Sequence, residues 1–220
     1  MAVQQDILST IPHFTGLSTA EFEGVRRLIV ERTVEKGQLV VMEGELSTAV
    51  YFIVSGAVKL FKTSSDGKEQ IFCIACPCKS FNEVSVLDGG VNPFSAQAMG
   101  AITLYEMSKA DFLAVIQRYQ HVAYNVANVL SLQIRRLISL VEDFSFKNVT
   151  GRVSKILLDS VLKKTCDHPR LTQQEMAAMA GTSREVVGRS LKSLEDSGAI
   201  RFDHHKIIVQ NRQKLEDIVG

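Results

Sequence analysis

Short apolar runs separated by glycines dominate the first half of the chain. The runs are rich in β-branched and aromatic residues and recur about every 8–12 residues, a spacing typical of a β-sandwich or barrel. The expected strands are residues 38–42, 49–54, 57–62, 69–74 and 102–107. Asp66-Gly67 lies between two of these runs and predicts a hairpin, because both residue types tolerate a positive φ.

Helical patterns flank these strands. Ser18 and Glu21 have the spacing of a capping box and predict a helix over residues 18–30. From Lys109 the apolar period changes to three or four, and no Gly or Pro interrupts residues 109–147, which predicts at least one long amphipathic helix. The near-heptad seam favours a dimer coiled coil over a helix packed only on its own domain. Its apolar positions are Val122, Val126, Val129, Leu130, Ile134, Leu137, Val141 and Phe144.

The last 75 residues form a separate helical pattern. One helix opens at residues 150–152 and runs to about residue 162. Thr172 and Glu175 form a capping box, residues 182–185 repeat the pattern after Gly181, and a further helix over 184–196 ends at Ser197-Gly198. Strands at 199–202 and 206–209 follow. Helix, glycine turn, helix and hairpin together predict a winged helix-turn-helix.

Length and charge narrow the class of protein. The 220 residues, 45% of them hydrophobic, suffice for one large or two modest domains. We expect a cytoplasmic protein without a membrane span, because no apolar run approaches the ~18 residues that a membrane helix needs and no N-terminal signal pattern is present. Residues 1–145 carry 12 basic and 15 acidic groups, whereas residues 146–220 carry 13 basic and 9 acidic groups. This asymmetry indicates that the second part of the chain meets a polyanion.

The segment TSREVVGR at residues 182–189 gives the most specific indication of function in the sequence. On a helix, Arg184, Glu185 and Arg189 share one broad face near the N-terminus. Arginine binds guanine with two hydrogen bonds in the major groove of DNA, and glutamate accepts one from cytosine. Residues placed to contact DNA phosphate are Gln174, Thr182 and Ser183. The alternative is a solvated charged face with an Arg–Glu pair.

These motifs, with Val149-Thr150-Gly151-Arg152 and LEDSGAI at residues 194–200, resemble the CRP/FNR family of bacterial transcription regulators. The first half resembles that family's sensor at residues 36–37, 43–45, 51–58, 81–83 and 86–90. The resemblance implies an α+β protein with a cupin-like β-roll sensor, a long dimerisation helix and a winged helix-turn-helix. The expected boundaries are 1–118, 119–146 and 147–220.

The resemblance also implies how such a protein works. Arg184, Glu185 and Arg189 would read a TGTGA-like half-site, and a homodimer would bind a palindrome in double-stranded DNA. Val186 replaces the family's hydroxyl residue, which removes one phosphate contact. Leu137, Ile138 and Val141 would transmit a small-molecule signal, and surface loops near residues 163–170 would contact RNA polymerase.

The sensor departs from the family pattern at the ligand positions. Phe94, before Ser95, replaces the phosphate-binding arginine, and Asn82 replaces a glycine, although the ribose-binding acid remains as Glu83. The hydroxyl pair that contacts the base corresponds to Leu137 and Ile138. A nucleotide phosphate buried without a cation is heavily penalised. We therefore expect an effector other than cyclic AMP, with a cyclic-nucleotide-responsive regulator as the alternative.

Three of the four cysteines, Cys73, Cys76 and Cys78, lie close together, and the fourth is Cys166. Structural thiols, a haem site and a redox or metal site remain open. Cys76-Pro77 resembles a haem-thiolate motif, and His13 or His121 could supply a second ligand. With the lost nucleotide contacts, the reading helix resembles the family branch that answers nitric oxide and nitrosative stress. A cupin-like metal enzyme is the other alternative, but no His-x-His pair occurs among the strands, so no enzyme activity is expected.

Overall fold

The computed structural model describes residues 5–162, 170–204 and 206–220. These residues divide into two compact units. The first unit contains the described residues up to 62 and residues 73–135, and the second contains residues 63–72, 136–162 and the described residues from 170 onward. The long helix α5 begins in one unit and ends in the other. No helix in the described part of the chain is long and apolar enough to cross a membrane.

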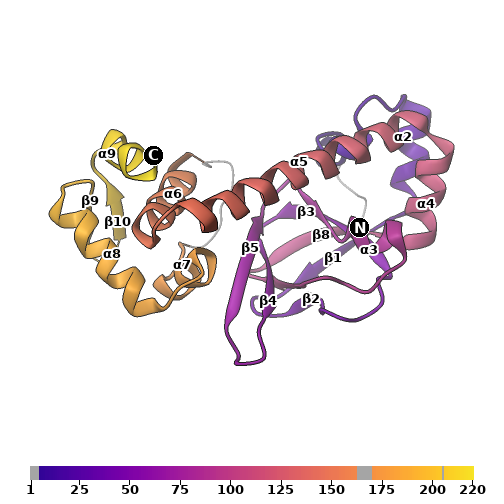
Figure 1. The fold of residues 1–220 in the computed structure, drawn as a ribbon. Helices are drawn as coiled ribbons and strands as arrows, with labels where there is room; N and C mark the ends of the chain where they lie inside the picture. Colours follow the sequence, from indigo (N-terminus) through magenta and orange to yellow (C-terminus); the bar gives the residue numbers. More distant parts are fainter. Residues whose placement is uncertain (1–4, 163–169, 205) are drawn as a thin grey trace. The chain divides into compact units, whose positions relative to one another are not determined.

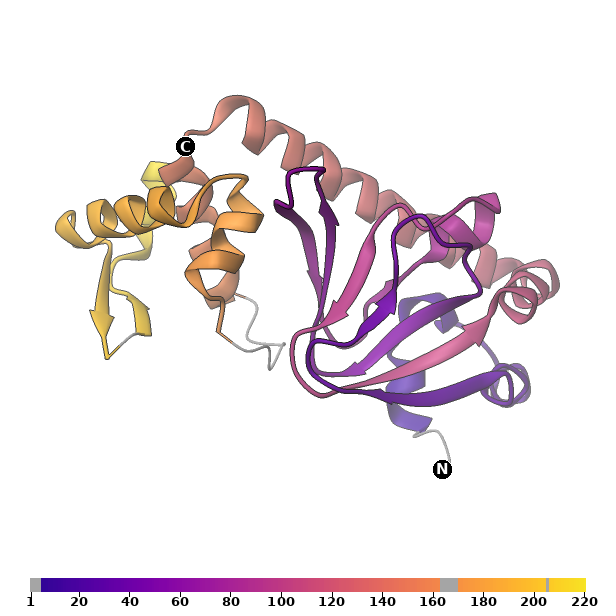
Figure 2. The ribbon, with the colours of Figure 1, turned by 90° about the horizontal axis from the view of Figure 1, so that it is seen from below.

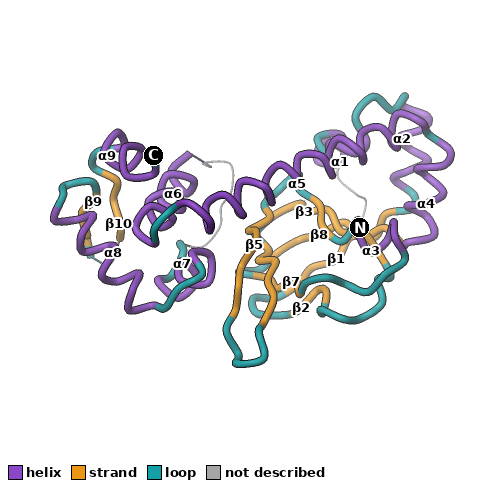
Figure 3. Tube along the Cα trace, in the orientation of Figure 1, coloured by secondary structure: helices purple, strands orange, loops and turns teal. Residues whose placement is uncertain are grey.

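Two four-stranded sheets, ordered β1-β8-β3-β6 and β2-β7-β4-β5, make up most of the first unit (Figures 1 and 3). Residue 63 of β4 and residues 69–72 of β5 are counted with the second unit. All strand pairs with a described register are antiparallel. The strands are β1 Ile29–Val34, β2 Leu39–Val41, β3 Ala49–Ser55, β4 Val58–Thr63, β5 Glu69–Ala75, β6 Ser80–Phe81, β7 Ser95–Ala98 and β8 Ile102–Ser108. The five expected strands are confirmed, and so is the hairpin turn, where Gly67 has φ +81°.

The central strand β3 explains why its sequence is apolar without alternation. Residues 49–53 are all buried, because both faces of the strand are covered. Phe52 points into one core, which helices line, whereas Tyr51 and Ile53 point into a second core between the sheets. Successive side chains of a strand lie on opposite faces, so a strand between two cores needs apolar residues at every position.

The helices of the first unit are α1 Gln5–Ser9, the 3₁₀ helix η1 Pro12–Phe14, α2 Thr19–Arg26, α3 Glu83–Asp88 and α4 Lys109–Arg118. The capping box of Ser18 and Glu21 is confirmed at the start of α2. The predicted helix over 18–30 is too long, because α2 ends at Arg26 and β1 begins at Ile29. Ile29 to Val34 pair with β8 along its length, and this tertiary pairing outweighs the local helical pattern.

The expected helical stretch from residue 109 is two helices. Tyr119 has φ −119° and ψ 99°, an extended conformation that separates α4 from α5 Gln120–Phe146. Val122 and Val126 of α5 are buried in the core of the first unit. Farther along, apolar side chains of α5 are more than half exposed at Ile134, Leu137, Ile138 and Val141.

The second unit contains the predicted winged helix-turn-helix. Its elements are α6 Val149–Leu162, α7 Gln173–Ala180, α8 Arg184–Asp196, β9 Ile200–Asp203, β10 Lys206–Val209 and α9 Arg212–Val219. The strands β9 and β10 form an antiparallel hairpin that projects from the helices in Figure 2. The helices bury one apolar core, and the final helix α9, which the sequence pattern had not indicated, contributes Leu215 to it.

Candidate functional site

The turn between α7 and α8 depends on a glycine in the left-handed region. Gly181 has φ +63°, and a Cβ atom there would lie 2.5 Å from Cε1 of Phe144. The backbone N–H of Gly181 and that of Thr182 both donate to the carbonyl of Ala177, which closes α7. The predicted capping role of residues 182–185 is therefore wrong by one position. Because Thr182 is held by the helix before it, Ser183 caps α8, accepting from the N–H of Val186 at 3.4 Å.

Helix α8 separates a buried face from an open one. Val187, Leu191 and Leu194 are buried in the core of the unit. The predicted base-reading residues, Arg184, Glu185 and Arg189, are all exposed on this helix. The apolar face fixes the orientation of the helix, so the three polar side chains extend from a rigid support.

Charge is retained at the start of α8. A hydrogen bond from the Ser183 side chain lowers the pKa of Glu185, and the charges of Arg184 and Arg189 lower it further. Glu185 is therefore an ionised acceptor at neutral pH. Of the predicted phosphate contacts, Gln174 and Ser183 are exposed and Thr182 is half-buried. They lie at helix starts, where backbone N–H groups favour anions.

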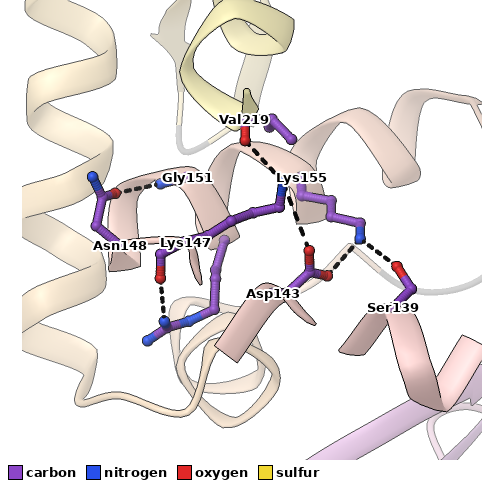
Figure 4. A network of polar contacts seen from close by, with 8 residues as sticks. Ser139, Asp143, Lys147, Asn148, Gly151, Lys155 and Val219 are labelled. Atoms are coloured by element: carbon purple, nitrogen blue, oxygen red, sulfur yellow. Dashed lines mark hydrogen bonds and ion pairs between the residues drawn. The ribbon is translucent and has the colours of Figure 1, made fainter. Parts of the chain in front are cut away.

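A polar network joins the end of α5 to α6 and α9 (Figure 4). The ammonium group of Lys155 pairs with Asp143 and donates to the Ser139 hydroxyl at 3.0 Å. Lys147 donates to the carbonyl of Val219 at 2.8 Å. Asp143 is only 7% exposed, so this carboxylate depends on its cationic neighbours. The network holds the last turns of α5 against α6 and α9, and no sequence motif indicated it.

In the predicted effector pocket, the side chain of Glu83 contacts a residue of the same chain. Oε1 of this carboxylate lies 3.3 Å from Nε2 of His13, and both side chains are at most 2% exposed. Asn82 has φ +80°, a conformation that asparagine tolerates better than most residues, which explains how it stands in for glycine. Its side-chain amide donates to Ser47 and to the carbonyl of Ala49 at 2.8 and 2.9 Å.

The other predicted pocket residues are engaged elsewhere or lie in the other unit. The Ser95 hydroxyl accepts from the backbone N–H of Glu43 at 3.0 Å. Phe94 is half-buried and packs against the core between the sheets. Leu137 and Ile138 belong to the second unit and are exposed. The sequence indicated the acid Glu83 but not its partner, because His13 lies far away in the chain and has no motif of its own.

A haem or metal site at the three clustered cysteines stays a prediction. Cys76 is disulfide-bonded, whereas Cys73 and Cys78 carry thiols. The Cys78 sulfur lies 3.2 Å from the Thr10 hydroxyl. Among the described residues, no group of three or more His, Cys, Asp or Glu side chains is placed to hold a metal ion. Nε2 of His13, predicted as a second ligand, lies 3.3 Å from Oε1 of Glu83. The polymerase contact expected near residues 163–170 falls outside the described residues except for Arg170.

The comparisons with known proteins cover both units. Residues 31–119 match the cyclic nucleotide-binding domain family, and residues 151–218 match the Crp-like helix-turn-helix domain family. The chain is 32% identical over 207 residues to the cyclic AMP receptor protein of Thermus thermophilus, an alignment that covers 94% of this chain and 96% of that one.

Solved structures agree with this match. The catabolite activator protein of Thermus thermophilus, 32% identical, aligns over 94% of this chain and 98% of its own with a TM-score of 0.56. FixK2 from Bradyrhizobium japonicum, 22% identical, shares the fold over 87% of this chain and 98% of its own with a TM-score of 0.78. The chain therefore belongs to the CRP family: it is a DNA-binding transcription regulator with a cyclic-nucleotide-binding-like domain, and not an enzyme.

Proposed function

We propose that the protein acts as a homodimer that binds a palindromic TGTGA-like site under the control of an effector other than cyclic AMP. The observation that carries this proposal is the open face of α8, where Arg184, Glu185 and Arg189 are exposed together. Two arginines and a carboxylate match the hydrogen-bonding edges of a G·C-containing half-site. In a two-fold dimer, two such helices address half-sites about one helical turn apart.

The binding experiment follows from this geometry. We expect the purified protein to bind a labelled palindromic TGTGA duplex in fluorescence anisotropy at least about 10³-fold more tightly than a scrambled duplex of equal length and composition. Salt must be fixed in both titrations, because phosphate contacts make all affinities salt-dependent. Equal affinity for the two duplexes contradicts the proposed site.

Dimerisation is supported by the exposed apolar positions of α5. Ile134, Ile138 and Val141 recur at a spacing of three or four, and their side chains are 58–65% exposed. A row of exposed apolar side chains along one helix is unusual unless another protein surface packs against it. Ile138→Asp places a charge in this seam, so we expect sedimentation to show a monomer with no preference for the palindrome. Leu132→Asp is the matched control, because Leu132 is 65% exposed but lies off the seam. A dimeric Ile138→Asp variant contradicts this interface.

We base the choice of an effector other than cyclic AMP on two features of the sensor: an apolar side chain where a cation is expected, and a buried acid that already has a contact. The relatives' names point to cyclic AMP, but Phe94 offers no charge for a phosphate and Glu83 already contacts His13. We expect calorimetric titration with cyclic AMP to give no measurable heat of binding, and palindrome affinity to stay unchanged. Tight binding would restore the cyclic-nucleotide-responsive alternative. A response to nitric oxide stays a prediction, which visible absorption of anoxically purified protein tests.

A further inference from the structure

The 3₁₀ helix η1, residues 12–14, lies between the sensor acid and the dimerisation helix. On one side, the imidazole of His13 contacts the carboxylate of Glu83, which opens α3. On the other side, the side-chain amide of Asn125 in α5 donates to the carbonyls of His13 and Thr15 at 3.2 and 2.8 Å. A single residue, His13, therefore contacts the pocket through its side chain and α5 through its backbone.

The surroundings of His13 leave the ring little freedom. Its side chain is 1% exposed, and its centroid lies 5.2 Å from that of Phe52 in an edge-on arrangement. Phe14 and Phe112 pack near the same ring. Closely packed side chains transmit displacement, because they cannot move into free space. A shift of Glu83 therefore changes the position of η1, rather than being absorbed locally.

We propose that His13 and Asn125 are positioning residues that couple the Glu83 pocket to α5 through η1. This inference rests on the proposed function, in which α5 transmits the effector signal to the DNA-binding helices α8 of the dimer. An effector that hydrogen-bonds to Glu83 competes with His13 for the same carboxylate. Release of His13 alters the backbone carbonyls that hold Asn125, and thereby the restraint on α5. The route uses the N-terminal turn of the same chain and needs no contact between the effector and α5.

The first experiment removes one contact of the route. Asn125→Asp keeps the shape of the side chain but replaces both amide donors with an acceptor that faces two carbonyl oxygens. We expect palindrome affinity per folded dimer to fall about two- to thirtyfold, the range that single coupling positions produce. Asn128→Asp is the matched control, because Asn128 makes the same charge change on the same helix and is exposed. A purely structural role lowers the melting temperature but leaves the affinity of the folded dimer unchanged.

The second experiment tests whether pocket and helix lie on one route. Glu83→Gln keeps the size of the side chain but removes its charge. If both residues act through η1, the double variant Glu83→Gln/Asn125→Asp weakens palindrome binding no more than the stronger single variant does. Effects that multiply show that the two residues act independently, and they overturn the proposal.

Hydrogen exchange gives a readout that does not depend on DNA. We expect Glu83→Gln to raise amide exchange in η1 and in α5 beyond residue 125, and Asn128→Asp to leave both unchanged. Faster exchange confined to α3 overturns the coupling even if the palindrome is bound. Faster exchange in η1 and α5 without any palindrome preference in the wild-type protein leaves the coupling standing and contradicts the proposed function instead.

Discussion

The charged residues on the open face of α8 and the acidic residue of the β-roll differ in their exposure to solvent. Arg184, Glu185 and Arg189 are exposed to solvent, whereas Glu83 is 1% exposed and meets His13 inside the protein. A surface that binds a polyanion must keep its charges accessible, because every contact replaces water and counterions. A buried acid instead needs a partner from its own chain, since an isolated buried charge is strongly penalised.

This difference shows that a sequence motif identifies a residue type but does not determine whether its side chain is accessible to a ligand. The charged α8 residues stay accessible, because nothing in the described chain covers them. Glu83 is instead buried, and its Oε1 lies 3.3 Å from Nε2 of His13 in the same chain. The presence of an acid at this position therefore does not by itself identify a ligand.

The largest effect is expected where a partner of the buried acid is removed. His13→Ala leaves the Glu83 carboxylate buried without its imidazole and opens space beside Phe52. We expect the free energy of unfolding to fall by about 3–5 kcal/mol, as measured by urea denaturation at fixed protein concentration. His204→Ala is the control, because its side chain is 96% exposed and only its contact with Asp203 is lost. Equal stability of the two variants would show that Glu83 does not depend on His13.

The second effect concerns recognition rather than stability. Glu185→Ala removes the acceptor on the open face of α8, so we expect about 1–3 kcal/mol less discrimination in favour of the palindrome. The urea midpoint of unfolding should equal that of the wild type, because the Glu185 side chain is exposed. Asp196→Ala, at the other end of the same helix, is the matched control. Unchanged sequence preference in the Glu185 variant removes its base-reading role.

The winged domain was predictable from the sequence because its signals are local. The capping box of Thr172 and the glycines at 181 and 198 specify helix ends within a few residues of where they occur. The N-cap of α8 was misassigned by one residue, since two adjacent hydroxyl residues compete and only the folded turn shows that Thr182 belongs to α7.

The sensor was only partly predictable, because its decisive contacts join distant segments. Five strands followed from apolar runs, but β1 was not predicted, and the expected helix over residues 18–30 overlapped its first two residues, which pair with β8. The acid Glu83 stood out by resemblance, whereas His13 lies in a short turn 70 residues earlier and joins it only in the fold. The disulfide at Cys76 likewise could not be deduced from spacing, which suggested a shared ligand site.

The smallest effect is expected at Ser183, whose side chain both caps α8 and lowers the pKa of Glu185. Ser183→Ala removes both the cap of α8 and the hydrogen bond that lowers the pKa of Glu185. We expect loss of the cap to cost about 1 kcal/mol of stability at neutral pH, as measured by urea denaturation, with Ser193→Ala on the same helix as control. NMR titration should show the Glu185 pKa rising toward its ordinary value of 4.5.

The sign of the pH dependence follows from that shift. A carboxyl whose pKa is lowered by folding contributes stability above its ordinary value of 4.5, and the contribution is lost as the pH falls through the lowered pKa. In the Ser183→Ala variant this contribution shrinks, so the difference in stability from the wild type should narrow as the pH falls below 4.5. A difference that stays constant through this range would assign the whole effect to the cap and none to the charge of Glu185.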